Sequence, residues 1–328
     1  MAEAHPPGLP PYAGMIGIPS GTFRMGSDRH YAEEAPAQTV AVYGFWIDPT
    51  PVTNAQFRAF IQATGYVTWA EIAPDAKDYP GALPHMLKAG GLVFTPPSRP
   101  VDLRDWSQWW SFTFGANWRR PYGKGSHIGG LDDHPVVQIA YRDAEAYAKW
   151  AGKEIPTEAE WEFAARGSLD DTEFAWGDEM TPGGRHMANT WQGNFPLENL
   201  KTDGYARTSP VRAFPANGYG VHDMIGNVWE WTADWYSTQH TAAAPKACCV
   251  PENPRGVTIE ASYDPTQPAV RIPRKVLKGG SHLCAPSYCR RYRPAARHAE
   301  AVDTSTSHVG FRCVVRVGSP DALYNAPV

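Results

Sequence analysis

The sequence has no long apolar run, no basic leader and no excess of positive charge. No stretch approaches the roughly 18 apolar residues of a membrane span. Residues 1–11, MAEAHPPGLPP, lack the basic region and apolar core of a secretory signal. The net charge is -4, which attracts neither nucleic acid nor an anionic membrane. We therefore expect a cytoplasmic protein that binds no nucleic acid and no membrane.

Cysteine is also scarce, with five in 328 residues. The odd number leaves at least one thiol unpaired in a monomer, as in a reducing compartment. Cys284 and Cys289 lie five positions apart, and Arg290, Arg291 and Arg293 follow them. Two such thiols can bind a metal ion that prefers sulfur, form a disulfide, or lie buried in an ordinary loop. Nearby arginines favour a thiolate, but arginines also pair with carboxylates at the surface.

Regular hydrophobic periods are few, whereas glycine, proline and aromatic residues are abundant. The chain has 30 Gly, 31 Pro and 13 Trp, so turns should be frequent and regular secondary structure sparse. Helices are predicted over about 53–63, 142–151 and 157–166. The first and third begin with capping boxes, in which a threonine precedes Gln56 or Glu160 by three positions.

Alternating patterns predict the strands and the domain organisation. Residues 15–26 are interpreted as strand, turn and strand, and residues 38–47 and 134–140 as further strands. We find no repeat and no linker. The prediction is one domain with little regular secondary structure. It spans 14–318, between flexible tails at 1–13 and 319–328, and residues 240–275 form an exposed loop.

Residues 67–135 form a long segment without a clear period. It is rich in tryptophan, including Trp109, Trp110 and Trp118. Long irregular segments in compact domains usually cover the core or serve a function. These aromatic side chains therefore either plug the core or line a groove that holds an extended peptide.

Two stretches have the oxygen-rich composition that a hard cation such as calcium requires. One joins residues 188–191 to 202–205, and the other is 222–231, where Asp223 and Glu230 flank a glycine-containing turn. Neither has the spacing of an EF-hand, and Asn and Asp in such loops are often simple turn formers.

Six ordered motifs resemble the sulfatase-modifying factor family, over about residues 14–317. That resemblance implies a compact α+β domain with little regular structure, related to C-type lectin-like folds. The motifs are IPSGTFRMG (18–26), PTEAEWEF (156–163), ANTWQG (188–193), GNVWEWT (226–232), KGGS (278–281) and HVGFRC (308–313).

Within the family, the two thiols resemble those of formylglycine-generating enzymes. These use molecular oxygen and copper(I) to oxidise the cysteine of a C-x-P-x-R segment in unfolded type I sulfatases to Cα-formylglycine, with a thiol as reductant. The resemblance implies that Cys284 and Cys289 bind copper. It also implies that Ser281, Tyr288 and Trp229 complete the catalytic pocket.

Two other functions remain possible at this point. One is a non-catalytic peptide-binding module of the same fold whose two thiols form a disulfide. The other is an iron-dependent oxidase, like family members that have a histidine site on a separate domain. The 11 histidines of this chain are scattered along the sequence, which does not favour iron.

The resemblance further implies two calcium sites and a substrate groove. Trp109, Trp110 and Trp118 are candidate groove walls. His308 stands where the secreted animal form of the enzyme has asparagine near the substrate groove. Ala165 and Pro294 stand where that form has cysteines, so Cys313 should be unpaired. Adjacent Cys248 and Cys249 are interpreted as incidental surface thiols. The implied calcium ligands are Asn189, Thr190, Asp203 and Tyr205 at one site and Asp223, Gly226, Val228 and Glu230 at the other.

Overall fold

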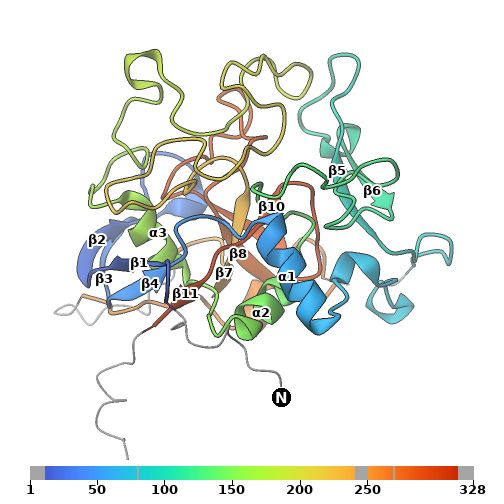
Figure 1. Ribbon diagram of the computed structural model, residues 1–328, viewed down its shortest axis with the longest axis horizontal. Coiled ribbons are helices and arrows are strands. Elements are labelled where there is room, and N and C mark those ends of the chain that lie inside the picture. Colours follow the sequence, from blue (N-terminus) through green and yellow to red (C-terminus); the bar gives the residue numbers. More distant parts are fainter. Residues whose placement is uncertain (1–11, 80, 241–249, 269, 317–328) are drawn as a thin grey trace, which may run out of the picture.

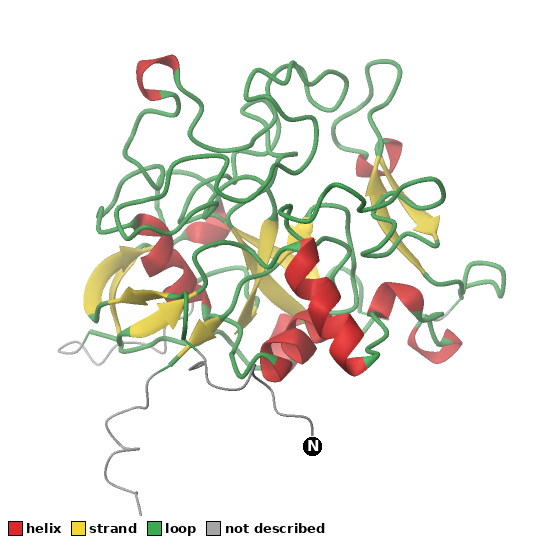
Figure 2. Ribbon diagram, in the orientation of Figure 1, coloured by secondary structure: helices red, strands yellow, loops and turns green. Residues whose placement is uncertain are grey.

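The computed structural model of the protein describes residues 12–79, 81–240, 250–268 and 270–316. Figure 2 shows most helices and strands gathered in the lower half of the molecule, whereas long loops dominate the upper half. The ring of Tyr12 stacks on Trp46 with 5.3 Å between centroids, so ordered packing begins slightly before the predicted domain start. Residues 1–11 and 317–328, which include most of the two predicted tails, lie outside the described residues. Cys248 and Cys249 also lie outside them.

The three predicted helices are confirmed. They are α1 (Asn54–Thr64), α2 (Tyr141–Trp150) and α3 (Glu158–Arg166). Thr53 and Thr157 close the predicted capping boxes, and Gly65 and Gly167 end α1 and α3 in the left-handed conformation. Figure 1 shows α1 and α2 side by side. Six short 3-10 helices are also described: Ala32–Glu34, Trp69–Glu71, Ala76–Asp78, Trp106–Gln108, Pro182–Gly184 and Glu260–Ser262.

The strands form four small sheets. The largest has the order β10-β7-β8-β9, in which β10 runs parallel to β7 and the other pairs are antiparallel. A second has the order β1-β4-β11, and β2 with β3 and β5 with β6 form two ribbons. The bounds are β1 Ile16–Ile18, β2 Gly21–Met25, β3 Gln38–Val42, β4 Phe45–Ile47, β5 Gly90–Phe94, β6 Trp110–Phe114, β7 Trp229–Trp235, β8 Arg274–Lys278, β9 Arg297–Ala301, β10 Val309–Gly310 and β11 Val314–Val315.

Two sequence-based predictions of strands were wrong, and one ribbon was missed. Residues 38–47 form two strands, because the Tyr43 and Gly44 amides donate to the side chains of Asn253 and Ser20 instead of a neighbouring strand. Residues 134–140 are not a strand, since Gln138 has a φ of 61° and interrupts the extended backbone. The β5–β6 ribbon was missed inside the segment predicted to be irregular.

The core has a large and a small part. The large part includes Phe57, Trp118, Trp161 and Trp231 between the helices and the central sheet. The small part comprises Trp109, Trp191, Phe195, Leu283 and Ala285, and it lies under the segment that carries the thiols. In the part of the chain that the structure describes, no helix is long and apolar enough to cross a membrane.

Buried ion pairs fix the thiol segment from both sides. Lys278, at the end of β8, donates to the Glu162 carboxylate of α3 at 2.9 Å. After the thiols, Arg293 donates to the Glu34 carboxylate, and Arg297 donates to Glu158 at 2.7 Å. Because buried charges require partners, these pairs constrain where the segment between residues 278 and 293 can lie.

Candidate active site around two free thiols

A turn after β8 brings the two predicted thiols together. Gly279 has a φ of 92°, and a Cβ there would lie 2.7 Å from the Met224 carbonyl oxygen, so only glycine fits. The Cys289 amide donates to the Ala285 carbonyl at 2.9 Å and closes the turn. The Cys284 and Cys289 sulfur atoms are 3.4 Å apart. Both are free thiols, so the disulfide of the alternative interpretation is not formed in this structure.

The two thiols have different electrostatic environments. Burial raises the pKa of the Cys284 thiol well above its ordinary value. The hydrogen bond from the Cys284 thiol lowers the pKa of Cys289, and the Arg291 guanidinium lowers it further. The Arg291 Nη1 lies 3.9 Å from the Cys289 sulfur. These opposite pKa shifts favour Cys284 as the donor and Cys289 as the acceptor in the contact between the two sulfur atoms.

Of the three arginines that follow the thiols, Arg291 is the one that contacts a thiol directly. Arg290 pairs with Glu173, and Arg293 pairs with Glu34. Arg291 is held by Glu33, whose Oε1 lies 3.2 Å from Nε, and its guanidinium lies 3.9 Å from the Tyr31 ring centroid. Arg291 therefore contacts a thiol, as one interpretation of the sequence predicted. Arg290 and Arg293 pair with carboxylates, as the other predicted.

Ser281 and His308 form a polar pair beside the thiols. The Ser281 amide donates to the Cys284 sulfur at 3.4 Å. The Ser281 hydroxyl accepts from the Leu283 amide at 3.2 Å and lies 3.2 Å from the His308 Nδ1. Partial burial, with a contribution from nearby His282, lowers the pKa of His308 well below its ordinary value. The imidazole is thus neutral at pH 7, and its tautomer decides whether Ser281 donates or accepts in this contact.

Aromatic side chains form a wall next to this polar pair. The Tyr288 ring, 38% exposed, stacks on Phe195 with 4.6 Å between centroids. Its edge contacts Trp109 at 5.6 Å. Trp110 contacts the His308 ring at 4.7 Å. Trp109, Trp110 and His308 therefore lie near the thiol segment, together with Phe195, which the sequence analysis missed. Trp109 is 2% exposed and belongs to the small part of the core, so the prediction that it lines a groove was wrong. That Trp110 and His308 line a groove stays a prediction.

Two other predicted residues lie differently. Trp118 is 2% exposed and packs edge-on against Phe57 of α1 at 5.3 Å, so it belongs to the core and the prediction that it lines a groove was wrong. Trp229 is 3% exposed, and its ring lies 5.7 Å from that of His298. Its amide donates to the His308 carbonyl at 2.9 Å, so it supports the His308 backbone. A direct role for Trp229 in the reaction stays a prediction.

The described residues do not offer an iron site. His282, His298 and His308, scattered in the sequence, come close enough for the first two to affect the pKa of the third. Even so, no group of three or more His, Cys, Asp or Glu side chains within the described ranges is arranged to hold a metal ion. The iron-dependent alternative therefore lacks structural support.

The first predicted calcium set contains an oxygen that lacks a partner. Asn189 Oδ1 is buried and accepts no hydrogen bond, although an orphaned buried acceptor is unfavourable. The Asp203 carboxylate accepts from the amides of Thr190 at 3.2 Å and Tyr205 at 2.9 Å. A buried amide oxygen near a carboxylate and backbone carbonyls suits a hard cation. The residues present therefore fit calcium at this site.

The second set fits a calcium ion less well. The Glu230 carboxylate accepts from Arg312 at 2.7 and 2.8 Å and from the Trp161 indole at 2.8 Å, so its charge is already compensated. Gly226 lies against the first set, because a Cβ there would be 2.4 Å from the Asn189 carbonyl oxygen. The roles of Asp223, Gly226, Val228 and Glu230 as calcium ligands stay predictions.

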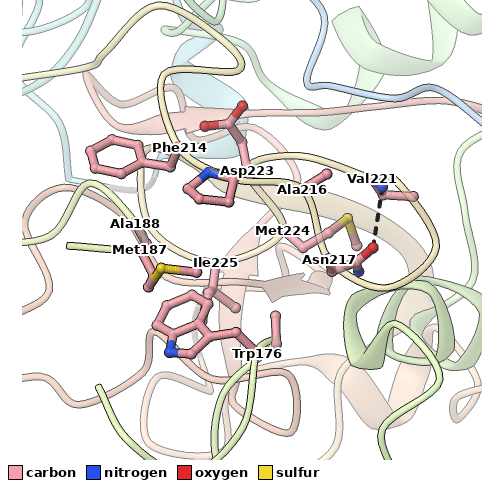
Figure 3. Close-up of a pocket in the computed structure, with 12 residues that line it drawn as sticks. Trp176, Met187, Ala188, Phe214, Ala216, Asn217, Val221, Asp223, Met224 and Ile225 are labelled. Atoms are coloured by element: carbon pink, nitrogen blue, oxygen red, sulfur yellow. Dashed lines mark hydrogen bonds between the residues drawn. The ribbon is translucent and has the colours of Figure 1, made fainter. Parts of the chain in front are cut away.

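A small cavity near the second set has a different lining from the thiol site. Figure 3 shows Ala188, Phe214, Asp223, Met224 and Ile225 around it. Its volume of about 20 Å³ holds little more than one water molecule. Neither thiol lines it, so it is not a pocket for the reacting group.

These features define a single α+β domain whose loops hold two free thiols beside an aromatic wall. The chain belongs to the sulfatase-modifying factor family, because the Sulfatase-modifying factor enzyme 1-like domain matches residues 2–317. The resemblance and the fold class predicted from the sequence are confirmed.

Comparison with individual proteins agrees with this assignment. The chain is 54% identical to the formylglycine-generating enzyme of Mycobacterium tuberculosis over 301 residues, which cover 92% of this chain and 97% of that protein. It is 34% identical to the inactive C-alpha-formylglycine-generating enzyme 2 of Bos taurus, over 93% of this chain and 89% of that protein. The structure of PvdO from Pseudomonas aeruginosa matches with a TM-score of 0.60 and 24% identity, over 92% of this chain and 94% of that chain, which shows a shared fold.

Proposed function

We propose that this protein is a formylglycine-generating enzyme. It oxidises the cysteine of a C-x-P-x-R segment in an unfolded type I sulfatase to Cα-formylglycine. The similarity to the M. tuberculosis enzyme supports this, but the inactive bovine relative shows that family membership alone does not imply activity. The observation that carries the proposal is therefore the pair of free thiols, with their sulfur atoms 3.4 Å apart.

The overall reaction balances with molecular oxygen and two equivalents of a thiol reductant. The substrate CH2–SH group, O2 and two thiols give an aldehyde, hydrogen sulfide, water and one disulfide. The Cβ of the substrate cysteine is oxidised, and oxygen is reduced with electrons from the substrate and the thiols. The protein must therefore hold one cysteine side chain and control protons around it.

The donor set fits a copper(I) ion. Cys284 and Cys289 would hold it, since thiolates are soft ligands and the arginine at 291 favours the thiolate at Cys289. When bound, copper(I) supplies the electron-transfer chemistry that activates oxygen. Free thiols at Cys284, Cys289 and Cys313 are consistent with a reducing compartment, and we place the protein in the cytoplasm.

The chain's own residues perform the remaining tasks. Ser281 and His308 offer a neutral hydrogen-bonding pair that can accept or donate a proton next to the reacting sulfur. Tyr288, stacked on Phe195 and half-exposed, covers one side of the site and limits access of water. Trp109 supports the Tyr288 ring from its edge.

The test uses a C-x-P-x-R peptide, oxygen, copper and a thiol, and mass spectrometry follows the change from thiol to aldehyde. Wild-type protein should convert the peptide, and Cys284→Ser and Cys289→Ser should abolish conversion. Cys313→Ala is the matched control, because Cys313 is a buried free thiol that pairs by its amide with Asp48. Competition titration should show one copper(I) per wild-type or C313A chain. The proposal is wrong if C284S or C289S retains full turnover.

The proposal includes calcium at the set formed by Asn189, Thr190, Asp203 and Tyr205. A cation there would satisfy the orphaned Asn189 Oδ1 and tie two loops, which stabilises the folded state. Removing calcium with a chelator should lower the melting temperature by several degrees. Asn189→Ala should abolish that difference, whereas Asn194→Ala, at an exposed position nearby, should keep it. A melting temperature insensitive to chelator would exclude this site.

A further inference from the structure

A large apolar groove lies beside the β5–β6 ribbon, and the site described above does not use it. Its volume is about 520 Å³, and it is lined by Ile72, Met86, Leu92, Phe112 and Phe114 among others. Met86 is 52% exposed, and Phe112 and Phe114 are each 48% exposed. Large apolar side chains exposed together mark a binding surface more often than an ordinary face of a protein.

One face of the β5–β6 ribbon connects this groove to the thiol site. Side chains alternate along strands, so Trp110, Phe112 and Phe114 point to the same side. Their register partners are Phe94, Leu92 and Gly90. Phe112 and Phe114 line the groove, whereas Trp110 contacts His308 and Phe94 stacks on Phe195. Figure 1 shows this ribbon at the side of the molecule.

A second segment runs the same way along β5. The Leu92 amide donates to the Ser305 carbonyl at 2.8 Å, and the Ser307 amide donates to the Leu92 carbonyl at 3.0 Å. The Phe94 amide donates to the Ser307 hydroxyl at 3.3 Å. This segment lines the groove at Thr304 and Ser305 and ends at His308, beside Ser281. The groove and the thiol site thus lie at the two ends of the same pair of segments.

We propose that this groove is a binding site for apolar side chains of the unfolded sulfatase polypeptide, outside the C-x-P-x-R segment. This inference rests on the proposed function. Trp110 and Phe114 are four residues apart, or about 13 Å along a strand. An extended substrate spans that distance with about four residues, so the groove reaches apolar side chains about four to eight residues from the reacting cysteine.

The chemistry of the groove suits this occupant. A folded sulfatase buries its apolar side chains, whereas an unfolded chain exposes them next to the C-x-P-x-R segment. Most residues of the lining are apolar, and the Phe112 and Phe114 rings are each 48% exposed there. Binding an apolar flank would therefore select unfolded chains and raise their local concentration at the thiols.

The experiment compares three C-x-P-x-R peptides: one with short serine flanks, one with leucine and valine four to eight residues before the cysteine, and one with them after it. Wild-type protein should show a KM about tenfold lower for one of the apolar peptides, as expected for burying an apolar side chain. Ile72→Ser and Phe114→Ser should remove that advantage and leave kcat/KM for the serine-flanked peptide unchanged. Leu169→Ser, at an exposed leucine outside the groove lining, is the matched control and should behave as wild type.

A binding measurement separates this inference from the proposed function. Peptides with serine in place of the reacting cysteine cannot turn over, and fluorescence anisotropy gives their Kd. If the apolar peptide has a lower Kd than the serine-flanked peptide and F114S removes that difference, the groove is supported whether or not turnover occurs. Equal Kd values for all peptides overturn the groove, and turnover of the serine-flanked peptide still supports the enzyme. A dimer that F114S dissociates would assign the groove to a second copy of the chain and also overturn the inference.

Discussion

At the scale of single residues, the site depends on neighbours that tune each thiol separately. Cys284 is buried, whereas Cys289 is half-buried and faces Arg291. Glu33 and the Tyr31 ring hold Arg291 in place. These neighbours shift the pKa values of two chemically identical side chains, five positions apart, in opposite directions.

Replacing Arg291 by methionine should raise the pKa of Cys289, because the substitution removes the cation next to its sulfur. The thiolate absorbance in the ultraviolet, followed against pH in a C284S background, measures this change. Arg290→Met is the control, since Arg290 pairs with Glu173 and not with the thiol. An equal shift in both variants would show that net charge, and not the contact at 3.9 Å, is responsible.

His308 should matter through the hydrogen bond that it shares with Ser281. His308→Leu removes the partner of a buried hydroxyl, and we expect kcat to fall about tenfold or more. His308→Asn keeps a hydrogen-bonding atom near the position of Nδ1 and should recover most of the activity. Steady-state kinetics with the serine-flanked peptide measure both. Equal loss in the two variants at unchanged melting temperature would show that the ring itself, through Trp110, is what matters.

At the scale of elements, the sequence predicted the helices well because their signals are local. The capping boxes at Thr53 and Thr157 require only residues three positions apart. The β5–β6 ribbon depends on pairing across residues 95–109, which no local period reveals. For the same reason the tryptophans could not be sorted in advance: strand register puts Trp110 beside His308, whereas Trp118 packs on α1.

The resemblance to the family predicted more of the site than the hydrophobic periodicity of the sequence did. The resemblance implied Cys284, Cys289, Ser281 and Tyr288 as site residues, and the fold brings them together. Their roles in the reaction stay predictions. The resemblance gave no indication that Arg291 would be the arginine at Cys289, because that choice depends on Glu33, more than 250 residues away in the chain. The position of Arg291 is thus set by a contact between loops that are far apart in the sequence.

Removing the cap of α3 should destabilise the protein as a whole. The Thr157 hydroxyl accepts from the Glu160 amide at 3.1 Å, and the Thr157 amide donates to the Glu160 carboxylate at 2.7 Å. Thr157→Ala should lower the free energy of unfolding by about 1 kcal/mol, measured by urea denaturation. Thr157→Ser keeps the hydroxyl and should stay close to wild type. If serine and alanine are equally destabilising, the lost methyl contact and not the cap is the cause.

At the scale of the whole molecule, buried ion pairs and contacts between loops stabilise the fold, and its sheets are small. Glu34 with Arg293, Glu158 with Arg297, and Glu230 with Arg312 join segments that are far apart in the sequence. Breaking one such pair leaves an uncompensated buried charge, which is strongly unfavourable. The stability of this fold should therefore depend on pH more than that of a domain held by an apolar core alone.

Two buried histidines make the direction of that dependence predictable. Burial lowers the pKa of His240 and of His282 to about 4, from an ordinary 6.5. Because the folded state holds both histidines neutral, the unfolded state binds more protons between these values. Their contribution to stability is complete above pH 6.5 and is lost as the pH falls towards 4, by up to about 3 kcal/mol for each.

Urea denaturation between pH 8 and pH 4 should therefore show the free energy of unfolding falling steeply below pH 6.5. His240→Gln removes one histidine whose pKa is lowered in the folded state, at a site away from the thiols, and should make the decline between pH 6.5 and 4 shallower. Replacing His127, an exposed histidine that accepts a hydrogen bond from the Gly129 amide, is the control and should leave the slope as in wild type. A decline of the same steepness in H240Q would mean that His240 is protonated in the folded state and that other groups set the acid limit of the fold.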